Sequence, residues 1–145
     1  MTEREAYDEL CAYTLSHQSL DFIHQHVVDA FAAQRADASS KPIAVAFALV
    51  GLCLQLERGF SGREVQRAHM LLAKRSKTWP TFPLPVERGA VTAVEVLAAP
   101  AGEARDAAIH DWCAAVWNAY TDQAPAVRAL LAEHRIGTPR RIRER

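Results

Sequence analysis

The sequence has few of the features that mark specialised classes of protein. Its three cysteines, Cys11, Cys53 and Cys113, lie far apart and form no C-x-x-C pair, which excludes a disulfide framework and a zinc knuckle. The longest apolar run, residues 42–54, is shorter than the roughly 20 residues of a membrane-spanning helix. The charged N-terminus lacks the apolar segment of a secretory signal. We therefore expect a cytoplasmic protein in a reducing environment, without a membrane partner.

An excess of charge of one sign is also absent, because 17 basic side chains balance 17 acidic ones. Domains that bind nucleic acid are usually strongly basic, so this balance argues against nucleic acid as a partner. The sequence contains no G-x-S-x-G, no glycine-rich phosphate loop and no H-E-x-x-H. Those motifs are the signatures of many hydrolases, nucleotide-binding proteins and zinc proteases. Whether the protein is an enzyme stays open at this point.

What is present favours helices. Half of the 145 residues are hydrophobic, and alanine is abundant. The β-branched residues do not form the alternating runs that are typical of strands. A chain of this length buries enough surface to form a core without disulfides or a metal. We predict an all-α fold, a single-domain bundle of about six helices over residues 1–134, followed by an arginine-rich, flexible tail at residues 135–145.

Local signals place the ends of these helices. The S/T-x-x-E pattern of a capping box, in which a hydroxyl and a carboxylate bond backbone N–H groups reciprocally, marks helix starts. It occurs at Thr2 and Glu5, at Ser61 and Glu64, and at Thr92 and Glu95. The predicted long helices cover about residues 3–14, 19–35, 41–58, 62–77 and 103–122, with a short helix at 92–99 and a last one from Pro125. The helix at 41–58 is apolar nearly all round and should lie at the centre.

A segment rich in proline and aromatic residues, residues 76–91, separates the fourth helix from the later ones. Its prolines prevent a continuous helix. Its apolar side chains are too numerous for a free linker, so we expect it to cross the bundle and bury its aromatic residues rather than form a mobile lid. We call this segment the strap. The residues that mark the strap as a candidate site are Trp79, Pro80, Phe82 and Pro83.

Histidines supply the candidates for a metal site. His24 and His69 each fall on the apolar stripe of their own helix, and Glu57 falls near the stripe of the helix between them. Two imidazoles and a carboxylate could hold a divalent metal such as zinc, as in bundles whose ligands come from separate helices. The alternative is that both histidines lie at the edge of the core and bond the backbone or Gln34.

Other residues could support or replace these ligands. His24 and His26 point in nearly opposite directions on one helix and cannot share a metal, whereas His26 and Asp29 lie on one face. We expect that face to be exposed, and a histidine in solvent near a carboxylate is the alternative interpretation. His110 on the helix at 103–122 is a reserve ligand.

Several motifs together resemble an uncharacterised bacterial all-helical family, a domain of unknown function. They are H-Q-H-V-V-D-A-F-x-x-Q at 24–34, V-Q-R-A-H-M at 65–70 and T-W-P-x-F-P-x-P at 78–85. The resemblance covers about residues 5–130 and includes His24, His26, Asp29, Gln34 and His69, but not His110. It implies a helical fold and no particular activity.

Charges are unevenly distributed along the neutral chain. Residues 1–30 hold six acidic and one basic side chain, residues 58–77 hold six basic and one acidic, and residues 135–145 hold five basic and one acidic. The acidic region could meet the basic helix in a second copy, or both could be ordinary solvated faces.

Our first hypothesis is a non-catalytic module that binds a protein or itself. The alternatives are a metal-dependent hydrolase or transferase of the bundle type and, third, weak binding of anions or nucleic acid through the basic fourth helix and tail.

Overall fold

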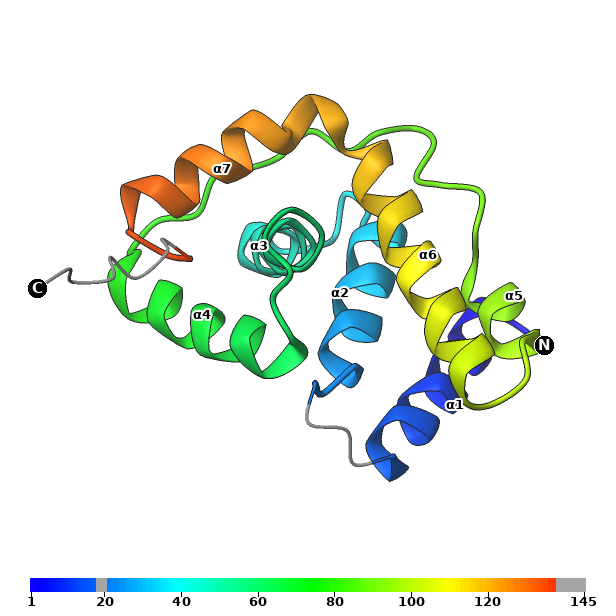
Figure 1. Ribbon diagram of the computed structural model, residues 1–145. Helices are drawn as coiled ribbons and strands as arrows, with labels where there is room; N and C mark the ends of the chain where they lie inside the picture. The colour runs from blue at the N-terminus through cyan, green and yellow to red at the C-terminus, as the bar shows by residue number, and fades with distance from the viewer. Residues whose placement is uncertain (18–20, 138–145) are drawn as a thin grey trace, which may run out of the picture.

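The computed structural model describes residues 1–17 and 21–137. Over these ranges the chain forms seven α-helices, one short 3-10 helix and no strand, which confirms the predicted all-α single domain (Figure 1). The α-helices are α1 (Glu3–Ser16), α2 (His24–Arg35), α3 (Pro42–Arg58), α4 (Gly62–Arg75), α5 (Ala93–Ala98), α6 (Glu103–Ala119) and α7 (Ala124–Glu133), and the 3-10 helix η1 is Thr121–Gln123. None of the described helices is long and apolar enough to cross a membrane.

The apolar helix α3 lies at the centre of the bundle, as its sequence predicts. It packs against α2, α4, α6 and α7, which surround it in Figure 1. Helices α1 and α5 pack against each other at the far side of α2 and α6. Burial of an all-round apolar helix removes a large hydrophobic surface from water, which is the main stabilising contribution to such a fold.

The predicted helix ends are largely correct. The capping boxes of α1 and α4 form at Thr2 and Ser61, and Gly59 ends α3 with φ of 67° in the left-handed region. The box predicted at Thr92 is wrong, because its hydroxyl donates to the Glu95 carboxylate at 3.4 Å and makes no bond with the backbone of α5.

Helix α2 begins later than its sequence predicts. Its first residue is His24, and the predicted start at Ser19 lies outside the described residues. Phe22 has φ of 52°, a left-handed conformation that a right-handed helix cannot continue through. The next helix therefore starts only after this residue.

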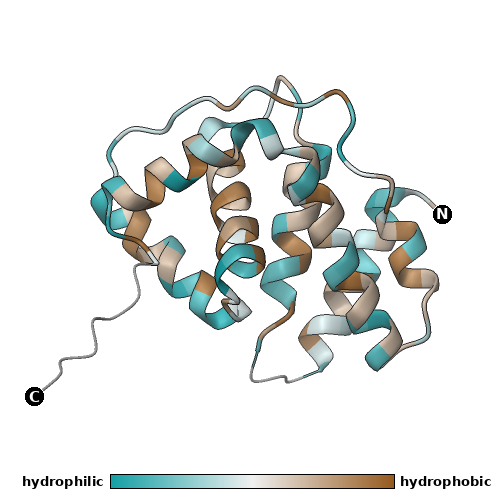
Figure 2. Cartoon of the chain, turned by 45° about the horizontal axis from the view of Figure 1, so that its top comes forward, coloured by the Kyte–Doolittle hydropathy of each residue, from teal (hydrophilic) through white to brown (hydrophobic). Residues whose placement is uncertain are grey.

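The strap crosses the bundle from the end of α4 to α5 (Figure 2). Phe82 is buried in the core, and Trp79 is partly buried with its ring edge-on to Phe47 at 5.3 Å. Pro80 and Pro83 are exposed, so these prolines restrict the backbone without packing into the core.

Gln34 of α2 fixes the C-terminal end of the strap. Its amide nitrogen donates to the carbonyl of Arg88 at 3.2 Å and to that of Val91 at 2.7 Å. Its amide oxygen accepts from the indole nitrogen of Trp112 at 2.9 Å. This one side chain therefore joins α2, the strap and α6.

The packed domain extends beyond the predicted boundary at residue 134. Ile136 is only 1% exposed and belongs to the core. Its N–H donates to the carbonyl of Leu131 at 2.8 Å. Residues after 134 therefore pack onto the bundle at least as far as Ile136. Most of the predicted arginine-rich tail, residues 138–145, lies outside the described residues, so where the domain ends stays a prediction.

Candidate functional site

The two histidines of the predicted metal site have separate partners. His24 Nδ1 lies 3.0 Å from the hydroxyl of Thr14. His69 is buried, its ring stacks on Phe47, and its Nε2 lies 2.8 Å from the Phe47 carbonyl oxygen. Because a carbonyl only accepts, His69 donates through Nε2. For His69, this is the bonding to the backbone that we considered as the alternative.

The third predicted ligand, Glu57, is engaged by α6 and α7. Its carboxylate accepts from Arg128 at 2.8 and 2.9 Å and from the indole of Trp117 at 3.1 Å, and Arg128 holds the pKa of Glu57 below its ordinary value. No group of three or more His, Cys, Asp or Glu side chains suited to a metal occurs among residues 1–17 and 21–137. The structure does not bring the predicted ligands together, and metal binding stays a prediction.

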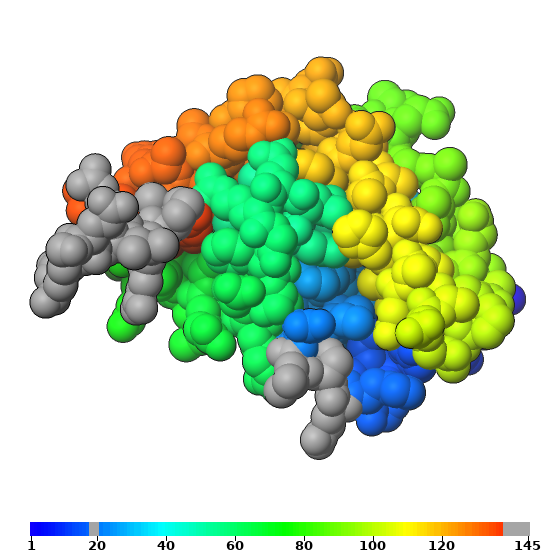
Figure 3. Space-filling model, in the orientation of Figure 1, coloured from blue at the N-terminus to red at the C-terminus, as the bar shows by residue number. Residues whose placement is uncertain are grey.

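A pocket of about 410 Å³ lies where α2, α3, α4 and α6 meet. In Figure 3, α2 is visible between the region of α3 and α4 and the helix α6. The lining residues are Asp21 and Ile23 from the segment before α2, His26 from α2, Gln55, Gly59, Phe60 and Ser61 from the end of α3 and the following turn, Glu64 from α4, and Asp106, Ile109 and His110 from α6. This pocket is the candidate functional site.

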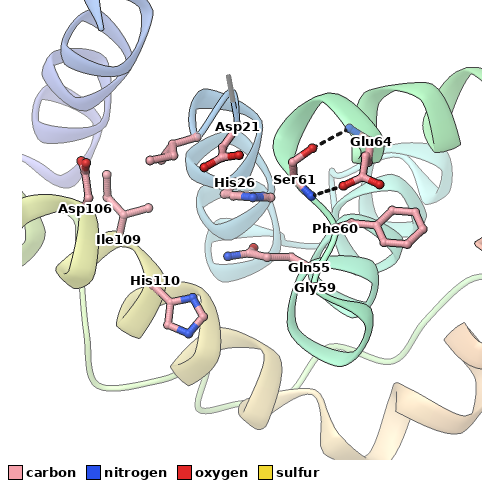
Figure 4. Close-up of a pocket in the computed structure, with 11 residues that line it drawn as sticks. Asp21, His26, Gln55, Gly59, Phe60, Ser61, Glu64, Asp106, Ile109 and His110 are labelled. Atoms are coloured by element: carbon pink, nitrogen blue, oxygen red, sulfur yellow. Dashed lines mark hydrogen bonds between the residues drawn. The ribbon is translucent and has the colours of Figure 1, made fainter. Parts of the chain in front are cut away.

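His26 and Gln55 are the buried polar side chains of this pocket (Figure 4). They are 8% and 9% exposed. Neither His26 Nδ1 nor Gln55 Oε1 has a hydrogen-bond partner in the part of the chain that the structure describes. Buried polar atoms without partners are rare in proteins and are normally satisfied by water or a ligand.

Burial sets the protonation state of His26. Desolvation, with a smaller contribution from the nearby His110, lowers its pKa to about 4, and Asp21 acts in the opposite direction. The imidazole is therefore neutral at pH 7, with one ring nitrogen that donates and one that accepts.

The prediction that His26 and Asp29 lie on an exposed face is wrong, because both are buried where α3 and α6 pack against α2. The thiol of Cys113 on α6 donates to the His26 carbonyl at 3.5 Å. Asp29 is buried, and its Oδ1 accepts from the amide of Gln25 at 3.0 Å, whereas Oδ2 has no partner in the described chain. Burial raises the pKa of Asp29 well above its ordinary value, so the fold favours the neutral acid.

The remaining predicted residues are divided between the pocket and the rest of the fold. His110 is exposed on α6 and lines the pocket. Gln34, which we considered as a hydrogen-bond partner of His24 and His69, holds the strap instead. Sequence reasoning missed Gln55, although it is the only polar side chain in the apolar stretch 42–56. A polar residue in such a helix is a recognisable signal of a buried site.

The sequence matches a family of unknown function, DUF5946, over residues 4–121. The protein belongs to this family. The match to DUF5946 extends from α1 to η1 and includes every residue that lines the pocket. Helix α7 of this DUF5946 protein lies beyond the matched range. Neither a curated protein nor a solved structure matches the chain.

Proposed function

We propose that this DUF5946 protein is a binding module for a small polar organic ligand, which it holds in the pocket between α2, α3, α4 and α6. The observation that carries the proposal is the pair of unpartnered atoms, His26 Nδ1 and Gln55 Oε1, on two buried side chains that line one pocket. A buried polar group without a partner costs about 1–3 kcal/mol. A ligand that bonds both atoms would recover part of that cost.

The size and composition of the pocket also support ligand binding. Its volume of about 410 Å³ lies within the range of roughly 300–1,000 Å³ that is typical of small-molecule sites. Ile23, Phe60 and Ile109 supply apolar wall. Apolar walls with a few convergent polar groups are the usual composition of such sites.

The lowered pKa of His26 favours a role in ligand binding over a role as a general base. A general base is most effective when its pKa lies near the working pH. The pKa of about 4 makes His26 a weak base at pH 7. The neutral ring is suited to hydrogen bonding.

Proton–nitrogen correlation NMR with acetamide, benzyl alcohol and benzylamine as probes tests this proposal. At least one probe is expected to shift the backbone signals of residues 23–26, 59–64 and 106–110 together. Gln55→Met keeps the length of the side chain and removes the acceptor, so it should weaken binding several-fold. Gln66→Met, on the exposed face of α4, is the matched control. If no probe shifts the pocket signals, or if the two variants bind equally, the proposal is wrong.

Self-association, our first hypothesis from the sequence, is a second candidate with its own supporting observation. Met70 and Leu71 are adjacent on α4 and expose 71% and 42% of their surface, and burial of such side chains favours association. A dimeric mass in light scattering that becomes monomeric in Met70→Lys would support it. A monomeric mass of the unmodified protein at both low and high salt would contradict it.

The other two predicted functions have less support. The metal-dependent enzyme has no suitable group of three ligands in residues 1–17 and 21–137. Binding of anions or nucleic acid would use Arg63, Arg67 and Lys74, which are exposed on α4. This function stays a prediction.

A further inference from the structure

We infer that the ligand of the pocket is an organic cation, a small amine in its protonated form with an apolar body. The inference rests on the proposed function and adds the chemical class of the ligand. It combines three features of the pocket lining: its charged side chains, its buried acceptors and its apolar side chains.

The charged side chains that line the pocket are all acidic. Asp21, Glu64 and Asp106 come from three different elements of the chain. Glu64 uses one oxygen for the capping box with Ser61, and Asp106 accepts from the hydroxyl of Tyr13 at 2.9 Å. Three carboxylates on one concave surface attract a cation and repel an anion.

No lysine or arginine from residues 1–17 and 21–137 lines the pocket to neutralise these carboxylates. Two basic side chains close to the pocket have aromatic partners of their own. The guanidinium of Arg63 lies over the ring of Phe22. That of Arg105 lies over the ring of Tyr13 and donates to the carbonyls of Leu97 and Ala99. The negative charge of the pocket is therefore available to a ligand.

The buried acceptors provide a second, independent observation. His26 and Gln55 are more than nine-tenths buried and line the same pocket, and their unpartnered atoms are able to accept hydrogen bonds. Gln55 Oε1 is an acceptor, and His26 Nδ1 is one when Nε2 carries the hydrogen. An ammonium group has up to three N–H donors and no acceptor, which complements such a set.

The apolar wall distinguishes an organic cation from a hydrated metal ion. Ile23, Phe60 and Ile109 offer no ligand atoms to a metal but would pack against a hydrocarbon or aromatic body. An aromatic ring such as that of Phe60 also attracts cations through its face. No group of three metal-binding side chains occurs in the described chain, which agrees with this choice.

Benzylamine and benzyl alcohol test the inference, because they have similar shapes and differ in charge at pH 7. We expect benzylamine to bind in the pocket about tenfold more tightly, since each exposed ion pair contributes a few-fold. The difference should shrink several-fold in the variant Asp21→Asn/Asp106→Asn and in high salt. Asp122→Asn, an exposed carboxylate outside the pocket, is the control and should leave the difference unchanged.

Other binding results would contradict the cationic ligand, the role of the carboxylates or the pocket itself. If both probes bind in the pocket with equal affinity, or if acetamide binds and benzylamine does not, the ligand is not a cation but the binding function stands. A preference for benzylamine that Asp21→Asn/Asp106→Asn leaves intact removes the role of the carboxylates and overturns the inference. If no probe shifts the pocket signals, both the inference and the proposed function are wrong.

Discussion

The carboxyl group of Asp29 on α2 occupies the space that a side chain at Gly51 on α3 would need. A β-carbon added to Gly51 would lie 1.9 Å from Asp29 Oδ2 and 2.6 Å from Asp29 Cγ. Glycine weakens a helix interior relative to alanine. The close approach of the buried Asp29 carboxyl group explains why position 51 of the central helix α3 is a glycine.

Gly51→Ala is expected to destabilise the fold by about 1–3 kcal/mol, the usual cost of overpacking a core. Denaturant unfolding measures this change. In the double variant Gly51→Ala/Asp29→Ala the carboxyl group is gone, so the double variant should be more stable than Gly51→Ala alone. Simple addition of the two single effects would contradict the contact.

Asp29→Asn is expected to stabilise the protein at pH 7. The folded state raises the pKa of Asp29. The stability that Asp29 contributes to the fold is therefore fully present below the ordinary pKa of aspartate and is lost as pH rises toward the folded-state pKa. Asparagine keeps the shape and never ionises. The advantage of the variant in unfolding free energy should therefore grow from pH 4.5 to pH 7. An advantage that is constant with pH would mean that Asp29 is not neutral in the fold.

His26 makes the fold sensitive to acid. The unfolded chain binds a proton near the ordinary histidine pKa of about 6.5, whereas the folded pKa is about 4. Stability due to this difference is present at neutral pH and is lost as pH falls from about 6.5 to about 4. Between pH 7 and pH 5 the loss from His26 is about 2 kcal/mol.

Urea unfolding of His26→Gln at those two pH values checks this loss. The variant should lose less stability on acidification than the unmodified protein. Burial also lowers the pKa values of His24 and His69, so part of the acid sensitivity should persist. His17→Gln, at an exposed position, should retain the full effect, and equal slopes for the two variants would refute the assignment to His26.

Gln34→Leu is expected to loosen the strap. It leaves the indole N–H of Trp112 and the carbonyls of Arg88 and Val91 without their present partner. The cost should be about 1–3 kcal/mol, as for other buried groups that lose a hydrogen bond. Limited proteolysis should then cut within residues 76–91 faster than in Gln66→Leu. If the two variants are cut at equal rates, Gln34 does not hold the strap.

Local signals were sufficient to predict much of the fold. The apolar stretch of α3 predicted its central place, and the capping box at Ser61 predicted the start of α4, because these signals act within a few residues. The hydroxyl of Thr92 shows the limit. The S/T-x-x-E pattern identifies a hydroxyl that is able to cap a helix. It does not show whether that hydroxyl bonds a backbone N–H or the neighbouring carboxylate.

The candidate site was harder to predict because its parts are joined by tertiary contacts. Periodicity placed His26 and Asp29 away from the apolar stripe of α2, but it could not show that α3 and α6 pack against that side of the helix and bury both residues. Glu57 was a candidate metal ligand because it falls near the apolar stripe of its helix. Its actual partner, Arg128, lies 71 residues away in sequence, so local spacing could not reveal the ion pair. Pairings over such distances leave no trace in local spacing.

Helix α2 has no side-chain cap at its N-terminus, and at its other end the guanidinium of Arg88 donates to the carbonyls of Gln34 and Ala36. A ribosome makes the chain from the N-terminus, so these carbonyls stay with water until more than fifty further residues have been added. The C-terminal end of α2 therefore gains these two bonds only after α3 and α4 have been made. The helix that carries His26 is among the earliest made, yet its last turn depends on a side chain of the strap.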